Sequence, residues 1–258
     1  MNRKICPILS EMKLHRQIAV IIFISLHGAA LAEPPNIRFG EISLLPSYCK
    51  HTQTFTTDDP RSRYIDSPAK SLYLEFGQSY LALHHYCWGL IYKRRAEQPG
   101  LSQSTRRAYY ESSINEYGYL LANSTFDFAL RPEVYLRIGE TYIALQAYSD
   151  AIEPLMRSIA AKPDYWPPYE RWAAVLNRLG KREEALEKLE AGLRLMPEER
   201  SLIEPYKRYG GDYAKFLKAL PPRAAAAAAS ATQTGTSSSL AAPAIAASAP
   251  APAASSSP

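Results

Sequence analysis

The feature that most constrains the fold of this 258-residue chain is an internal repeat. Two consecutive blocks, residues 132–165 and 166–199, have the same length and align without a gap. Six positions correspond at an offset of 34: Tyr135 with Tyr169, Gly139 with Ala173, Tyr142 with Leu176, Ala151 with Ala185, Leu155 with Leu189 and Pro163 with Pro197. A period of this length is typical of proteins that stack one helical unit on the next.

Each block contains two helical patterns. We expect helices near 133–145 and 150–161 in the first block, and near 168–179 and 182–195 in the second. Small residues such as Gly139 let two antiparallel helices approach closely, and the aromatic and leucine side chains beside them fill the remaining space. The prolines end the second helix of each block. The corresponding positions are therefore interior positions.

On these residues the sequence resembles the tetratricopeptide repeat (TPR) family, in particular its exported bacterial members. The resemblance implies an all-α fold, a right-handed solenoid of antiparallel helix pairs. Two positions depart from the pattern: Pro154 stands inside a helix and is expected to bend it, and Gln146 takes the turn position that Gly180 takes in the second block. Stacked repeats need neighbours, so we expect residues 68–130 to form a divergent helix pair with a connecting loop about seven residues too long.

Residues 1–32 have the order of a secretory signal. Lys13 and Arg16 precede an apolar run over 18–26, and Ala30-Leu31-Ala32 follows it. The start lies at Met1 or at Met12, which gives a more compact basic region. Export to the periplasm is the leading prediction, and a secreted or envelope-associated protein stays open. An uncleaved anchor is disfavoured because the apolar run is short for a membrane span.

Loss of this signal changes the charge. It removes four basic residues and one acidic residue, so the formal net charge falls from +5 to +2. Attraction to phosphate is then weak, and we expect no nucleic-acid binding. We also expect a mature chain that does not span a membrane, because no apolar run reaches about 18 residues. Association with a membrane through a partner stays open.

The remaining segments are read from composition and breaks in the pattern. Residues 33–67 are rich in proline and are expected to be irregular, before Ser67 and Pro68 begin a long helix that runs to about Arg95. A second helix is expected near 104–121. Residues 200–223 are expected to form a capping helix interrupted at Gly210-Gly211. In residues 224–258, 16 of 35 are alanine, 8 serine and 4 proline, which predicts a disordered tail.

Every histidine of the mature chain lies within three residues of a cysteine. Cys49 is near His51, and Cys87 is near His84 and His85. A disulfide between Cys49 and Cys87 is the favoured interpretation, because the chain is exported and its mature cysteine count is even. The alternative is a zinc site made by Cys49, His51, His84 and Cys87, since two thiolates and two imidazoles satisfy tetrahedral zinc.

No catalytic motif is present, so we expect no enzyme activity and no cofactor. The TPR resemblance implies a groove that binds a peptide or helix of another protein. The groove positions are Leu136, Glu140, Ile143, Tyr165, Glu170, Asn177 and Arg178. Leu136 and Glu140 replace the cationic and amide residues of the chaperone-binding members, so binding of a free C-terminal carboxylate is not implied. The function expected is that of a scaffold or assembly factor for a cell-envelope complex. The alternative is a metal-handling or redox-linked periplasmic accessory protein.

Overall fold

The computed structural model describes residues 36–56, 61 and 66–220, and their regular structure is entirely helical. The predicted signal at 1–32 and the predicted tail at 224–258 lie outside these residues. In chain order the elements are α2 (Phe39–Ile42), η2 (Ser47–His51), α3 (Pro68–Phe76), η3 (Gly77–Ala82), α4 (Leu83–Ala96), α5 (Gln103–Ala122), α6 (Arg131–Ala144), α7 (Tyr148–Ala161), α8 (Pro167–Arg178), α9 (Arg182–Leu195), α10 (Arg200–Arg208) and α11 (Tyr213–Ala219).

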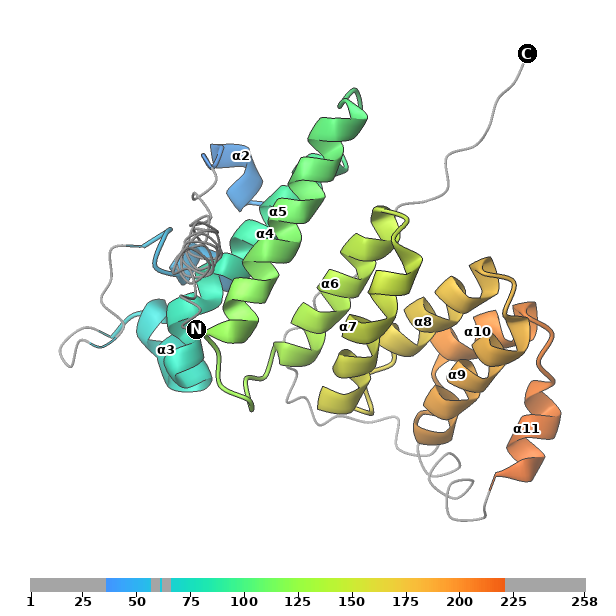
Figure 1. The fold of residues 1–258 in the computed structure, drawn as a ribbon. Coiled ribbons are helices and arrows are strands. Elements are labelled where there is room, and N and C mark those ends of the chain that lie inside the picture. The colour runs from blue at the N-terminus through green and yellow to red at the C-terminus, as the bar shows by residue number, and fades with distance from the viewer. Residues whose placement is uncertain (1–35, 57–60, 62–65, 221–258) are drawn as a thin grey trace, which may run out of the picture. The chain divides into compact units, whose positions relative to one another are not determined.

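The two repeat blocks each fold as an antiparallel helix pair, as predicted (Figure 1). α6 packs on α7 and α8 packs on α9, and a three-residue turn joins the helices of each pair. The turn explains how Gln146 substitutes for glycine. Its φ is +60°, close to the +76° of Gly180, so both blocks use the same left-handed turn residue. A side chain in that conformation costs about 1 kcal/mol.

The small residues lie where the helices of a pair meet. A Cβ placed on Gly139 would lie 2.8 Å from the Leu155 side chain, and Ala151 and Leu155 are fully buried. Tyr135 departs from the interior role predicted for it. Its half-buried ring lies against the guanidinium groups of Arg131 and Arg157. α7 continues through Pro154, which is buried inside the helix.

The first unit begins as predicted but is broken into more pieces. The Ser67 hydroxyl accepts a hydrogen bond from the backbone N–H of Lys70, and Pro68 is the first helical residue. The single helix predicted to reach Arg95 is wrong, because α3 ends at Gly77, which has a φ of +56°. A 3₁₀ turn follows, and α4 starts only after it. Apolar residues continue at helical spacing on both sides of Gly77, so the break cannot be predicted from their spacing alone.

The extra length of the first pair lies mainly in a helix. α5 has 20 residues, against 14 in both α7 and α9, while six residues connect α4 to α5. The connection itself is only three residues longer than the three-residue turns of the next two pairs. Gly89 of α4 meets the Tyr117 ring of α5, and the Ser113 hydroxyl donates to the Gly89 carbonyl at 2.8 Å. This packing matches the contact between Gly139 and Leu155 in the next pair.

The C-terminal cap also has the predicted break. α10 and α11 are separated at Gly210-Gly211, and Gly210 has a φ of +91°. Leu202 and Phe216 are buried against the core of the α8–α9 pair. Within the described residues, no helix is long and apolar enough to cross a membrane.

Candidate partner-binding face

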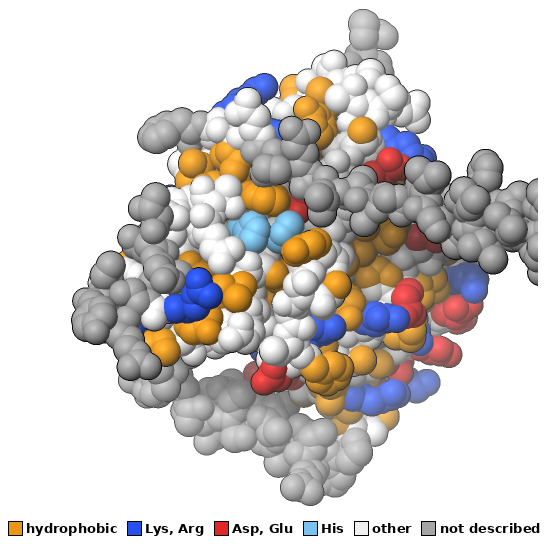
Figure 2. Space-filling view, turned by 60° about the vertical axis from the view of Figure 1, so that its left-hand side comes forward, with side chains coloured by type: hydrophobic (Ala, Val, Ile, Leu, Met, Phe, Trp, Pro, Cys, Tyr) orange, Lys and Arg blue, Asp and Glu red, His pale blue; other side chains and the backbone are white. Residues whose placement is uncertain are grey.

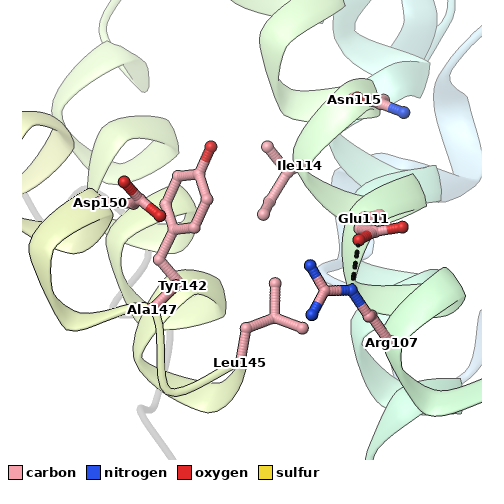
Figure 3. Close-up of a pocket in the computed structure, with 8 residues that line it drawn as sticks. All are labelled: Arg107, Glu111, Ile114, Asn115, Tyr142, Leu145, Ala147 and Asp150. Carbon is pink, nitrogen blue, oxygen red and sulfur yellow. Dashed lines mark hydrogen bonds and ion pairs between the residues drawn. The ribbon is translucent and has the colours of Figure 1, made fainter. Parts of the chain in front are cut away.

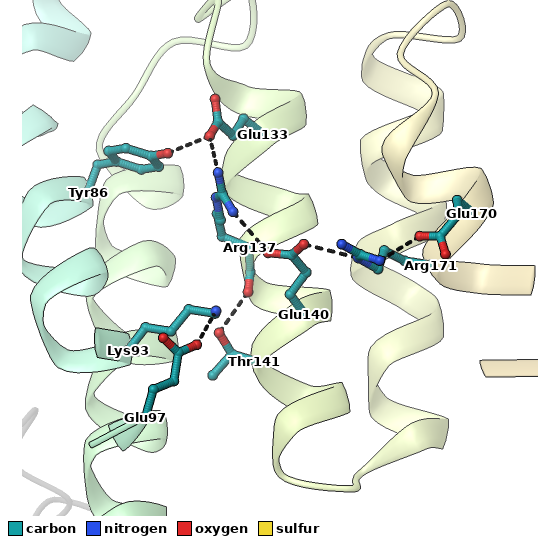
Figure 4. Close-up of polar contacts among 9 residues, drawn as sticks. All are labelled: Tyr86, Lys93, Glu97, Glu133, Arg137, Glu140, Thr141, Glu170 and Arg171. Carbon is teal, nitrogen blue, oxygen red and sulfur yellow. Dashed lines mark hydrogen bonds and ion pairs between the residues drawn. The ribbon is translucent and has the colours of Figure 1, made fainter. Parts of the chain in front are cut away.

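Arginine and glutamate side chains from α6 and α8 form a continuous row of salt bridges, which we call the charge ladder (Figure 4). On α6, Arg137 Nη2 lies 2.9 Å from Glu133 Oε1, and Arg137 Nη1 lies 3.0 Å from Glu140 Oε2. Glu140 Oε1 lies 3.1 Å from Arg171 Nε of α8, and Arg171 Nη1 lies 2.6 Å from Glu170 Oε2. The charges alternate in sign, so each inner group has two opposite neighbours.

The two cations of the ladder are equivalent under the repeat, because Arg137 and Arg171 are 34 residues apart. The first pair continues the same register. Gly89 and Gly139 both lie at the closest approach of their helix pairs, and the residue two places earlier is Cys87 in α4 and Arg137 in α6. We call the side of α4, α6 and α8 that carries these three residues the ladder face.

The ladder face extends onto α4 through a tyrosine. The Tyr86 hydroxyl donates a hydrogen bond to Glu133 Oε1 at 2.7 Å, which links α4 to the first carboxylate of the ladder (Figure 4). Lys93 lies two turns further along α4 and pairs with Glu97 at 2.6 Å. Polar contacts therefore run across three consecutive first helices, and they join units that are far apart in the sequence.

The pKa values of two carboxylates of the ladder, Glu140 and Glu170, shift in opposite directions. Burial alone would raise the pKa of Glu140, yet the guanidinium groups of Arg137 and Arg171 hold that pKa below its usual value. Burial, together with the nearby charge of Glu140, raises the pKa of Glu170, and the opposing effects of Arg171 and Arg208 do not offset this. Glu140 therefore keeps its charge to a lower pH than an ordinary glutamate, whereas Glu170 takes up a proton more readily.

The charge that this face presents to solvent is mainly positive. Arg171 exposes 37% of its side chain, against 21% for Glu170. Arg178 is exposed at the end of α8, where it donates to the Tyr148 hydroxyl at 2.6 Å and covers that ring. Arg208 of α10 is also exposed and is close enough to Glu170 to lower its pKa. Exposed guanidinium groups therefore gather around α8, whereas the exposed carboxylate of Glu97 lies beside α4.

The structure separates the seven residues predicted to line the groove. Glu140 and Glu170 belong to the ladder, Ile143, Tyr165 and Asn177 are half-buried, and Arg178 is exposed. Leu136 does not line a surface. It is 3% exposed and packs with Ala151 and Leu155. The TPR resemblance places Leu136 on the groove side of its helix, but in the structure its side chain is buried in the core of the α6–α7 pair.

Arg137 and Arg171 are the residues that sequence reasoning missed. The sequence pattern singles out neither arginine, although each pairs with two carboxylates. A clue was present, since both are arginines at the repeat offset of 34 on helices of the same type. Recurrence of a charged residue at equivalent repeat positions indicates a shared side of the solenoid.

The N-terminal segment 36–56, which we call the strap, lies against α4. Cys49 and Cys87 are paired with an S–S distance of 2.11 Å, and both are fully buried. Among the described residues, no group of three or more histidine, cysteine, aspartate or glutamate side chains could hold a metal ion. The four residues considered as zinc ligands therefore do not converge here.

The histidines have separate roles in packing. His85 Nδ1 lies 2.6 Å from Glu116 Oε2, both side chains are buried, and the Tyr119 ring stacks on the imidazole at 3.9 Å. His84 packs edge-on against Trp88, and burial together with the charge of His85 lowers the pKa of His84 to about 4. Figure 2 shows histidine side chains at this surface, bordered by apolar side chains.

A separate pocket of about 260 Å³ lies between α5 and the turn that joins α6 to α7 (Figure 3). One wall carries the ion pair between Arg107 and Glu111, and the opposite wall carries Tyr142, Leu145 and Asp150. The pocket lies beside the first half of the long helix α5, so it is associated with the added length of that helix. Sequence reasoning identified none of its residues as a site.

A scan against models of known families finds no match for this chain, and a search of curated proteins also finds none. Solved structures do match. One is the first TPR of Spaghetti (RPAP3), bound to the HSP90 peptide SRMEEVD; it is 19% identical, the match covers 47% of this chain and 91% of that chain, and the TM-score is 0.36. That likeness says nothing about a ligand of this chain. The helix pairs themselves make the fold TPR-like.

Proposed function

We propose that this chain is an exported, non-catalytic protein that holds an acidic peptide or helix of another protein against its ladder face. The observation that carries the proposal is the arrangement of charge on that face. The carboxylates are partly buried and paired, while Arg171, Arg178 and Arg208 keep exposed guanidinium groups. Guanidinium groups bind carboxylates with strong, directional hydrogen bonds. The proposed role is a scaffold or assembly factor for a cell-envelope complex.

Export is supported by the signal-like residues 1–32 and by the pairing of Cys49 with Cys87, because disulfides persist in oxidising compartments. Two measurements test it. The intact mass of the protein purified from its host is expected to match a chain that starts at Glu33. A thiol assay before reduction is expected to find no free cysteine in that chain, and two reactive thiols would contradict the bridge.

Charge reversal tests the binding face. We expect Arg178→Glu to reduce the yield of partner crosslinked in the native host by about tenfold, since one exposed cation becomes an anion facing an acidic partner. The matched control is Lys215→Glu, which changes an equally exposed cation on α11, away from α4, α6 and α8. Both variants are expected to melt within about 2 °C of the parent. Equal capture by the two variants would count against the assignment.

A further inference from the structure

The strap runs antiparallel to α4 along its whole length. Its beginning lies at the end of α4, where Arg95 Nε and Nη2 donate to the Glu41 carboxylate, each at 2.7 Å. Its end lies before the start of α4, where the Tyr80 hydroxyl donates to the His51 carbonyl. The segment is thus fixed at both ends, and between them its 3₁₀ helix η2 contacts both α3 and α4.

The side of α4 that the strap covers is the ladder face. Cys49 of the strap is bonded to Cys87, which holds on α4 the place that Arg137 and Arg171 hold on α6 and α8. In the second and third pairs this place carries a charge that belongs to the candidate binding face. In the first pair it carries a covalent link to the chain's own N-terminal segment.

An aromatic residue of the strap reaches the ladder itself. The Tyr48 ring lies 6.4 Å from the Tyr86 ring, centre to centre. Burial and the nearby Glu133 carboxylate raise the pKa of the Tyr48 hydroxyl. Tyr48 therefore occupies space next to the first carboxylate of the ladder.

The contacts of the strap are those of a bound peptide. α4 and the turn before it recognise backbone carbonyls, since Arg94 Nη2 donates to the Leu44 carbonyl at 2.9 Å and Tyr80 donates to that of His51. Among the side chains, the Glu41 carboxylate pairs with Arg95, and the Tyr48 ring, seven residues later, packs near Tyr86 beside the buried Leu45 and Cys49. This recognition resembles the acidic ligand proposed for α6 and α8.

We propose that the strap is a resident ligand of the ladder face. α4 recognises a segment of two short helical turns, in which an aromatic residue of the second turn follows a carboxylate of the first by seven positions, and residues 36–56 fill that site within the same chain. This inference rests on the proposed function of α6 and α8. While the strap is bound, a partner segment reaches the second and third pairs but not the first.

The test asks whether α4 recognises the strap sequence when it is supplied separately. The full-length chain carries Cys6→Ser, Cys49→Ser and Glu41→Ala, so Cys87 is its remaining cysteine and its own strap lacks the carboxylate. The probe is a synthetic peptide of residues 36–56 in glutathione buffer. The peptide thiolate attacks the disulfide between Cys87 and glutathione, a bond forms between the peptide sulfur and Cys87, and glutathione leaves as its thiolate.

The intact mass of the chain reports how much peptide is attached. The native peptide is expected to give about tenfold more adduct than a scrambled peptide with cysteine at the same place, and its Glu41→Gln form an intermediate amount. Equal adduct from native and scrambled peptides would overturn the proposal. The unaltered chain, reoxidised with about 1 mM of either peptide, gives the same comparison if the variant fails to fold. The peptide assay measures binding at α4, whereas Arg178→Glu tests partner binding at α8. A failure of the strap proposal can therefore be told apart from a failure of the proposed function.

Discussion

In the α4–α5 pair, the residue two places before the glycine of closest approach is Cys87, whereas the corresponding residues of the next two pairs are Arg137 and Arg171. The cysteine is buried beneath the strap, and the arginines join a ladder that solvent reaches. The same helix-pair geometry therefore supports a covered face in one unit and an open face in its neighbours. What differs is the chemistry of one repeat position, which decides what can lie on it.

A second contrast lies inside the pairs. Tyr135 and Tyr169 are equivalent residues of the second and third pairs, and the corresponding residue of the first pair is His85. Tyr135 lies against the guanidinium groups of Arg131 and Arg157, and the Tyr169 hydroxyl donates to the Pro163 carbonyl, whereas His85 lies against the buried Glu116. The first unit thus adds to its apolar core a buried polar pair and a covalent link, which the corresponding positions of the next two units lack. Four predictions test this contrast, starting with the largest expected effect.

Removing the bridge is expected to have the largest effect. Cys49→Ala combined with Cys87→Ala removes a link between residues 38 positions apart, and the chain-entropy model gives a loss of about 4 kcal/mol in the free energy of unfolding. Urea denaturation under non-reducing conditions measures it. Lys215→Ala, at an exposed position of α11, serves as the control and is expected to change the free energy of unfolding by less than about 0.5 kcal/mol. A loss under about 1 kcal/mol would mean that the polar contacts of the strap suffice.

Removing the histidine partner is expected to rank second. His85→Leu leaves the Glu116 carboxyl buried without its partner, and we expect a loss of about 3 kcal/mol. Adding Glu116→Leu is expected to recover at least half of that loss, because the uncompensated polar group is then gone. Urea midpoints of both variants give the comparison. If the double variant is less stable than the single one, the pair is not the reason for the loss.

The two glycines of closest approach are expected to tolerate alanine differently. A Cβ on Gly89 would overlap the Tyr117 ring, which is buried and rigid, so Gly89→Ala should lower the free energy of unfolding by about 2 kcal/mol. Gly139→Ala places its Cβ 2.8 Å from Leu155, whereas that of Gly89→Ala would lie closer still to Tyr117, and Ala173 already occupies the place equivalent to Gly139, so the loss for Gly139→Ala should stay below about 1 kcal/mol. Thermal melts rank the two, and a reversed order would show that the first pair is the looser one.

The smallest expected effect is a loss in the free energy of unfolding as the pH falls. The pKa of His84 is about 4 in the folded protein against 6.5 in its unperturbed state, so the unfolded chain binds the proton first. Its contribution is complete above pH 6.5 and is lost as the pH falls towards 4. Because the ring is partly exposed, we expect a loss of about 1–2 kcal/mol. His84→Gln should remove this slope, measured by urea midpoints at several pH values. In the ladder, Glu140 takes up its proton at a lower pH than an ordinary glutamate, whereas Glu170, with its raised pKa, does so at a higher pH.

The repeat blocks were predictable because their period encodes their packing. Gly139 and Ala173 identify the closest approach of each pair, and their positions follow from the sequence alone. The break at Gly77 was not predictable from spacing, because Leu72, Phe76 and Tyr80 continue a helical pattern across it. There the backbone conformation of one glycine prevails over the apolar period.

The candidate face was predictable only in part. Of the predicted groove positions, Glu140 and Glu170 take part in the ladder and Arg178 is exposed, but Leu136 belongs to the core. Charge pairing between units cannot be read from local spacing, since Arg171 meets Glu140 from a different repeat. The predicted pairing of Cys49 with Cys87 already implies that the N-terminal segment is held to the first helix, but the contact of Glu41 with Arg95 does not follow from the sequence.

The strap also gives the molecule two unlike ends. In a stack of helix pairs, each unit is stabilised chiefly by its immediate neighbours, so unfolding can spread from a free end. At one end, α4 is fastened by a sulfur bond and by the contacts of Arg95 with Glu41. At the other, α11 rests mainly on α10. Local unfolding should therefore begin at α11 and proceed towards α4. Backbone amide hydrogens are expected to exchange fastest in α11 and slowest in α4.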